Sequence, residues 1–305
     1  IAFMTYAMQI LMSFMMLSMI FVMVPRAQAS ADRINEVLNT DSEIKDVPNP
    51  ELLSLKGDKA TLAFEHVNYR YQHAENLALE DIDFSAKSGE TVAIIGGTGS
   101  GKTTLVNLLP RFYDVESGKI LLNGKNIKDT SQHNLREMIG FVPQKAVLFT
   151  GTIRENMQYG ALNATDEEIW QALEIAQAKA FVSELAEGLD SHVEQGGGNF
   201  SGGQRQRLAI ARALVKPADV YVFDDSFSAL DFKTDANLRK ALKEQMTDAI
   251  VVLVAQRVST VMEASTILVL DEGKLVGKGT HEELLANNQT YQEIVHSQLR
   301  EEDLA

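Results

Sequence analysis

The stretch that decides the fold is Gly96-Gly97-Thr98-Gly99-Ser100-Gly101-Lys102-Thr103. It matches the pattern G-x-x-x-x-G-K-[ST] at every position, and this pattern describes a loop whose backbone N–H groups surround a phosphate chain. The apolar run from Thr91 to Ile95 comes just before it and predicts a buried parallel strand. Thr104 to Leu109 comes just after it and predicts a helix. Strand, glycine loop and helix in this order are the context that the pattern requires.

The loop predicts a bound nucleotide and Mg²⁺. A helix N-terminus contributes partial positive charge where the phosphates would lie. Lys102 would reach the outer phosphates and the Thr103 hydroxyl would hold the metal, and Thr104 belongs to the same predicted phosphate-binding set. The alternative is a glycine-rich turn that binds nothing, but the flanking strand and helix favour the nucleotide.

Composition excludes some classes of site and partner. The 305 residues include no cysteine, so disulfides and thiolate metal sites are excluded. The formal net charge of −14 argues against a nucleic-acid partner, because DNA and RNA repel an acidic chain. The six histidines are scattered along the sequence, and we interpret them as structural or exposed.

The first segment is of a different kind. From Ile1 to Val24 there is no charged residue, and a helix of this length, at 1.5 Å per residue, can cross a hydrocarbon core of about 30 Å. The first basic residues, Arg26 and Arg33, follow it, which predicts that its C-terminal side is cytoplasmic. The alternative is a buried, methionine-rich helix of a soluble protein. Because the chain starts with Ile, we expect a C-terminal fragment of a longer membrane protein.

The rest of the chain has the pattern of an α/β domain. Residues 40–59 hold two prolines and several acids and predict a linker, so that residues 1–39 form the apolar helix with its extension and residues 60–305 form the domain. Asp166 to Gly188 has helical periodicity. Val220–Phe223 and Ile250–Ala255 predict two buried strands, each followed by polar residues. In open α/β sheets, ligands bind at the carboxyl ends of such strands.

Two acids follow the first of these strands. Asp224 would hold Mg²⁺, directly or through water, and Asp225 would face the attacking water. Paired acids after a strand are common, so this interpretation depends on the phosphate loop.

A second glycine turn, Ser201-Gly202-Gly203-Gln204, precedes a second predicted helix. One triphosphate needs only one cradle, so this turn could serve a nucleotide held by another subunit. Taken alone, it is better explained as a helix N-terminus capped by Ser201.

The order of these motifs resembles the nucleotide-binding domain of ATP-binding-cassette (ABC) exporters, over about residues 60–298. Tyr71 lies where that family stacks a ring on adenine, although it could be an ordinary strand aromatic. Gln144 lies where the family has a glutamine that contacts Mg²⁺ and water, although it could be a surface amide.

Further motifs strengthen the resemblance. Residues 201–204 resemble the family's signature motif, entered here through Phe200 where Leu is commoner. Asp231 ends a loop similar to the one that crosses the family's dimer interface. Arg111–Asp114 and Leu148–Asn156 are similar to exporters rather than importers.

The resemblance implies a fold, cofactors and partners. It implies a P-loop NTPase fold with a RecA-like core, an antiparallel β subdomain and a helical signature subdomain, preceded by the last transmembrane helix of a multi-pass cell-membrane protein. It implies ATP and Mg²⁺ as cofactors, a second ABC half-transporter as partner, membrane lipid around the helix and a cytoplasmic domain. The residues that line the transport pathway would mostly precede Ile1.

Two residues depart from the family pattern. Asp225 stands where the catalytic base is usually Glu, and Gln256 stands where the switch residue is usually His. Asp is shorter by one methylene, about 1.5 Å, and a general base must come within hydrogen-bond reach of its water. Glutamine donates a hydrogen bond but carries no proton or charge. We therefore expect ATP binding with slow hydrolysis.

These departures predict one half of a heterodimeric exporter. The chain's own site would be degenerate, and its intact signature motif, residues 201–204, would complete the competent site of the partner. The alternatives are a homodimer that tolerates both residues, an ABC protein acting on ribosomes or DNA, and a nucleotide sensor that transports nothing.

Overall fold

The computed structural model describes the backbone of residues 1–302 and the side chains of residues 1–298. The last three residues of the predicted domain, 303–305, lie outside the described part. The chain divides into two compact units, residues 1–45 and residues 46–305.

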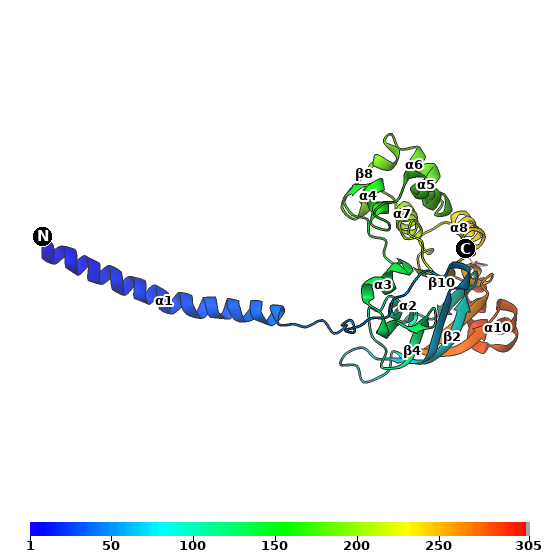
Figure 1. Cartoon of the computed structure of the whole chain (residues 1–305), viewed down its shortest axis with the longest axis horizontal. Helices are drawn as coiled ribbons and strands as arrows, with labels where there is room; N and C mark the ends of the chain where they lie inside the picture. Colours follow the sequence, from blue (N-terminus) through cyan, green and yellow to red (C-terminus); the bar gives the residue numbers. More distant parts are fainter. Residues whose placement is uncertain (303–305) are drawn as a thin grey trace. The chain divides into compact units, whose positions relative to one another are not determined.

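The first unit is dominated by α1 (Ala2–Leu38), a single helix that continues through Pro25 (Figure 1). It is long and apolar enough to cross a membrane. Within this described unit no α1 residue is buried, which differs from the core helix of a soluble protein. The hydroxyls of Ser13 and Ser18 donate to carbonyls four residues earlier, so these polar groups are satisfied inside the helix.

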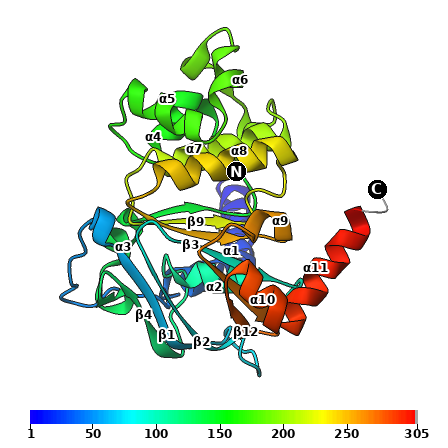
Figure 2. The same ribbon diagram turned by 90° about the vertical axis from the view of Figure 1, so that its right-hand side faces the viewer.

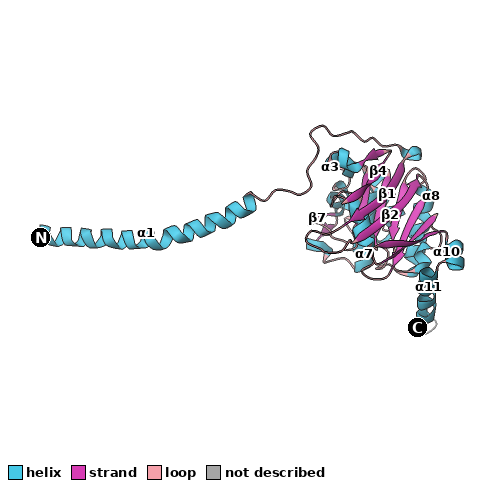
Figure 3. Ribbon diagram, turned by 90° about the horizontal axis from the view of Figure 1, so that it is seen from below, coloured by secondary structure: helices cyan, strands magenta, loops and turns pink. Residues whose placement is uncertain are grey.

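The second unit is built on a mixed sheet (Figure 3). Its ten strands follow the order β5-β4-β1-β2-β12-β11-β3-β10-β9-β6. From β11 to β6 neighbouring strands are parallel, whereas β5, β4, β1 and β2 pair antiparallel. The strand bounds are β1 Thr61–Tyr69, β2 Leu79–Lys87, β3 Thr91–Gly96, β4 Ser117–Leu122, β5 Lys125–Asn126, β6 Ile139–Val142, β9 Val220–Asp224, β10 Ile250–Val254, β11 Thr266–Asp271 and β12 Lys274–Gly279. A separate pair joins β7 (Gly151–Thr152) to β8 (His192–Val193).

Some helices pack beside the sheet, and others form a separate group (Figure 2). In that view α4, α5, α6 and α7 gather above the sheet, while α10 and α11 lie beside β12. The α-helices of this unit are α2 Lys102–Leu108, α3 Gln132–Glu137, α4 Ile153–Gln158, α5 Asp166–Ile175, α6 Lys179–Ser183, α7 Gly202–Leu214, α8 Phe232–Gln245, α9 Val258–Val261, α10 His281–Asn287 and α11 Gln289–Glu302. The short 3₁₀ helices are Gly57–Lys59, Ile127–Asp129, Gly188–Asp190 and Gln195–Gly197. The α/β prediction is confirmed.

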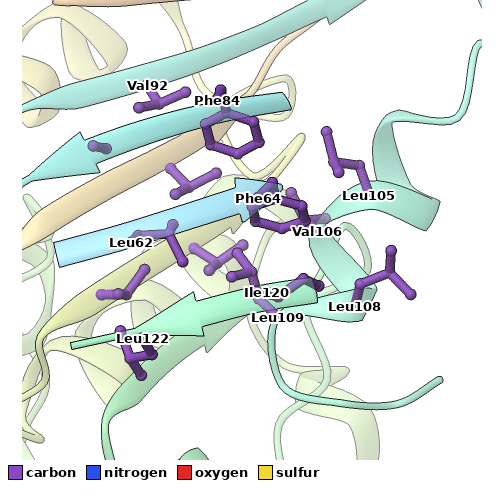
Figure 4. Packing of buried hydrophobic residues seen from close by; sticks show 14 of the residues in the cluster. Leu62, Phe64, Phe84, Val92, Leu105, Val106, Leu108, Leu109, Ile120 and Leu122 are labelled. Atoms are coloured by element: carbon purple, nitrogen blue, oxygen red, sulfur yellow. The ribbon is translucent and has the colours of Figure 1, made fainter. Parts of the chain in front are cut away.

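Apolar periodicity explains the main elements. Every residue of β9 and β10 is buried, as continuous apolar runs in a covered parallel sheet predict. The antiparallel strands β1 and β2 instead alternate, and their Phe64 and Phe84 rings stack with centroids 4.6 Å apart. Figure 4 shows this cluster, in which Leu105 and Leu108 of α2 lie beside the residues of β1 and β4.

The segment before β1 is docked on the sheet although most of it has no regular structure. We call residues 46–57 the docked segment. The Leu53 N–H donates to Asn134 Oδ1 (2.6 Å), and Asn134 Nδ2 donates back to the Leu53 carbonyl (3.1 Å). The N–H groups of Lys56 and Gly57 donate to the buried carboxylate of Asp219, at 2.9 and 3.1 Å. Asp219 immediately precedes β9, so this segment is fixed to the strand that ends in Asp224.

Candidate nucleotide site

The glycine loop joins β3 to α2 at the carboxyl end of the parallel strands. This chain's own structure constrains several of its glycines, including Gly99, which has φ of +81°. Gly101 caps α2 with φ of +99°, in the region that L side chains rarely adopt. A Cβ on Gly96 would lie 2.1 Å from the Leu270 carbonyl oxygen of β11. By contrast, a Cβ on Gly97 would meet no atom within 4 Å.

The Lys102 side chain lies across its own loop. Its Nζ donates to the carbonyls of Gly96 (2.8 Å) and Gly97 (2.6 Å). Partial burial lowers the pKa of Lys102, and the nearby carboxylates of Asp225 and Asp224 oppose that decrease. The loop therefore carries a partly desolvated cation beside two acids, which suits a phosphate chain bound with a divalent metal.

Thr103 and Asp224 form the pair of oxygen ligands expected for Mg²⁺. The Thr103 hydroxyl donates to Asp224 Oδ1 over 3.1 Å, and Asp224 is only 3% exposed. Burial, and to a smaller extent the charge of Asp225, raise the pKa of Asp224. A hydroxyl and a carboxylate fit Mg²⁺, a hard cation that keeps several waters and needs few protein ligands.

Asp225 is held between two amides. Gln144 Nε2 donates to Asp225 Oδ2 over 3.2 Å, and Gln256 Nε2 donates to the same oxygen over 2.7 Å. Burial raises the pKa of Asp225, while the two amide donors oppose the increase. Its φ of +47° lies in the left-handed region, so the backbone turns sharply where the carboxylate leaves the end of β9.

Tyr71 borders this site through Thr104. The two hydroxyls are 2.8 Å apart, and 39% of the Tyr71 surface is exposed. Its ring meets those of Tyr69 and Tyr113 edge-on, with centroids 5.0 and 5.5 Å away. The ring is thus fixed beside the start of α2, and an exposed aromatic surface remains for a planar ligand.

The signature-like turn caps α7. The Ser201 hydroxyl accepts from the Gln204 N–H (3.2 Å), and Gln204 Oε1 accepts from the Ser201 N–H (2.9 Å), which is a capping box. Of the two glycines between them, Gly202 has open space around an added Cβ, and Gly203 would meet only ordinary contacts. Packing inside this chain therefore does not require glycine at 202.

Asp231 also serves as a helix cap. Its carboxylate accepts from the N–H and the hydroxyl of Thr234, at 3.0 and 2.7 Å, and these bonds lower the pKa of Asp231. Among the described residues, no hydrogen bond joins Asp231, Ser201 or Gln204 to the Lys102 loop. The structure thus brings together the loop, both acids and both amides, but not the signature-like turn.

Sequence reasoning missed two residues that support this site. Asp219 fixes the docked segment to β9, and Gln298 of α11 binds the backbone around Gln256. Neither belongs to a motif. Their partners are 163 and 42 residues away along the chain, so no local pattern indicates them.

Known proteins resemble this chain in both sequence and fold. Residues 79–228 match the family model described as ABC transporter. An uncharacterized ABC transporter ATP-binding protein of Mycobacterium tuberculosis is 44% identical over 301 residues, which are 98% of this chain and 51% of that protein. An ATP-dependent lipid A-core flippase of Xanthomonas oryzae is 41% identical over 280 residues, 92% of this chain and 47% of the flippase. The chain spans about half the length of the curated relatives it matches.

A solved structure of an ABC exporter has the same fold as most of this chain. The structure of a bacterial Atm1-family ABC exporter with ATP bound superposes with a TM-score of 0.85 at 34% identity. The match covers 93% of this chain and 49% of that exporter. It therefore extends well beyond the segment that the family model matches.

Proposed function

We propose that the ATP-binding domain of this chain, which belongs to the ABC transporter family, binds Mg-ATP and drives export across a membrane. The similarity to a flippase and to an exporter with ATP bound supports this proposal. The apolar α1 would lie in the cell membrane among lipids, with the domain in the cytoplasm.

The residues around the loop would divide the binding of Mg-ATP among them. The backbone of residues 96–101 and the Lys102 cation would hold the phosphates, and Tyr71 would contact the adenine. Thr103, Asp224 and Gln144 would hold Mg²⁺, which supplies charge neutralisation between the outer phosphates. Lys102 would exchange its bonds with the Gly96 and Gly97 carbonyls for bonds with phosphate oxygens.

The bond from Gln256 to Asp225 is the observation that carries the proposal of slow hydrolysis. A general base has to accept a proton from water, and Gln256 orients Asp225 but carries neither a proton nor a charge that could assist that transfer. Both amide bonds fall on Oδ2, so Oδ1 is the oxygen that would face the water. The shorter Asp side chain would hold that oxygen further from the water than Glu would.

The signature-like turn would act on a second chain. Gly202 has no steric or conformational reason to be glycine within this chain, whereas a phosphate held by another subunit would need close approach to the backbone there. We therefore infer a dimer in which residues 201–204 complete the partner's site. Asp225 and Gln256, the two residues that differ from the family pattern, both belong to this chain's own site. We therefore favour a heterodimer whose partner has a competent site.

Removing one hydroxyl tests the binding site. Thr103→Val keeps the side-chain volume but loses the oxygen that contacts Asp224. We expect the affinity for ATP with Mg²⁺ to fall about tenfold or more, and the affinity for ATP in EDTA to change little, when both are measured by calorimetric titration. Equal affinities of variant and wild-type protein for Mg-ATP would place the metal elsewhere and contradict the proposed site.

A further inference from the structure

The loop that carries Gln256 is held by a residue from the far end of the chain. Gln298 lies on α11, and its Nε2 donates to the Gln256 carbonyl over 2.6 Å. Its Oε1 accepts from the Val258 N–H over 2.7 Å. One side-chain amide therefore makes two bonds to the backbone on either side of Arg257.

This contact supplies a helix-capping bond that the loop itself lacks. Val258 is the first residue of α9, and the N-cap residue of that helix, Arg257, makes no side-chain capping bond. The first N–H groups of a helix have no partner inside the helix. Gln298 satisfies one of them, so it replaces the missing cap and fixes the end of the loop.

The position of Gln298 is in turn fixed by packing. Tyr291 of α11 is fully buried, Val295 is 8% exposed, and both belong to one apolar cluster with Val258 and Val261 of α9. The two helices are therefore parts of the same core. A shift of α11 would move the backbone of Gln256 relative to Asp225.

We propose that Gln298 is a positioning residue for ATP hydrolysis. It couples the position of α11 to the alignment of Gln256 with Asp225. This inference rests on the proposed function. Gln298 touches neither the glycine loop nor the two acids among the described hydrogen bonds, so it acts through Gln256 and not on the nucleotide. It therefore affects the rate of the chemical step and not the affinity for ATP.

The test compares three variants of the protein assembled with its partner chain, whose own phosphate loop is inactivated so that only this chain's site is measured. Gln298→Ala removes both bonds. Gln298→Glu has the same size and still accepts from Val258, but cannot donate to the Gln256 carbonyl. Gln292→Ala is the matched control, because Gln292 lies on the same helix and its Nε2 donates to the Leu285 carbonyl, away from the Gln256 loop.

We expect kcat for Gln298→Ala to fall about threefold to tenfold, the effect of one or two lost neutral hydrogen bonds, with the Kd for Mg-ATP unchanged within twofold. In Gln298→Glu, kcat should fall almost as much as in Gln298→Ala. In Gln292→Ala, kcat should not change. Since the contact is to the backbone, the effect should persist in a Gln256→His background. Unchanged kcat in Gln298→Ala, or a Kd that rises as much as kcat falls, overturns the inference. If wild-type protein binds no Mg-ATP, the proposed function itself fails, and the wild-type Kd reports that separately.

Discussion

Gln256 and Asp225 are joined by a 2.7 Å hydrogen bond between the amide Nε2 of one and the carboxylate Oδ2 of the other. They follow neighbouring parallel strands, β10 and β9, so the sheet itself brings them together. The two residues that depart from the family pattern are therefore partners and form one unit. A change at either one alters the hydrogen bonding of the other.

The buried charge of Asp225 predicts a pH-dependent stability. Burial raises the folded-state pKa of Asp225 above the ordinary value of 3.8, so the protonated form is favoured in the folded domain. The stability that this group contributes is present below pH of about 4 and is lost as pH rises through the folded pKa. Asp225→Asn removes the charge, keeps an acceptor for both amides, and tolerates the positive φ.

We therefore expect Asp225→Asn to raise the midpoint of thermal unfolding at pH 8 and to lose this advantage near pH 4. Asp58→Asn, the same substitution at an exposed carboxylate, is the control. If Asp225→Asn raised the midpoint of thermal unfolding equally at pH 4 and pH 8, the charge of Asp225 would not destabilise the fold.

The docked segment predicts a second effect on stability. Asp219 is 1% exposed and accepts from the N–H groups of Lys56 and Gly57 and from Asn123 Nδ2. Asp219→Ala leaves these donors without their acceptor, which should lower the free energy of unfolding by about 2–4 kcal/mol. Chemical denaturation measures this, with Asp58→Ala as the exposed control. A loss below about 0.5 kcal/mol would show that the segment is not held by Asp219.

Local sequence patterns predict the parts of the fold that depend on neighbouring residues. The glycine loop, β9 and β10 lie where the glycine pattern and the continuous apolar runs predict them. The predicted helical stretch from Asp166 to Gly188 is divided instead into α5 and α6, because Gln177 adopts φ of +58° and ends the first helix. A single residue in the left-handed region leaves no trace in apolar periodicity.

Contacts between distant residues have no such local pattern. The carboxylate of Asp225 is predicted from its place after a strand, but its two amide partners are 81 and 31 residues away. Only a family motif indicates Gln144, and Gln256 is indicated only by its place where that family usually has His. Asp219 and Gln298 match none, and their roles depend on how the sheet and α11 bring them to their partners.

The signature-like turn predicts an effect on the other chain. Gly202→Asp adds a carboxylate in open space, so the stability of this chain and its own affinity for ATP should change little. In the assembled pair the charge would repel the partner's phosphates, and steady-state ATP turnover should fall at least tenfold. Gly202→Ala should have a smaller effect, because it adds volume without charge. Full turnover in Gly202→Asp would show that the turn does not serve the partner's site.

The most direct test of the account is the single-turnover rate of phosphate release from ATP at this chain's own site. It is measured with the partner's phosphate loop inactivated, in wild-type protein and in the double variant Asp225→Glu/Gln256→His. Glu would extend the carboxylate towards its water, and His would supply a group that can carry a proton. We predict a rate about 10² to 10⁴ times higher in the double variant, with the Kd for Mg-ATP unchanged within threefold. A wild-type rate equal to that of the double variant would contradict the proposal that Asp225 and Gln256 make this site slow.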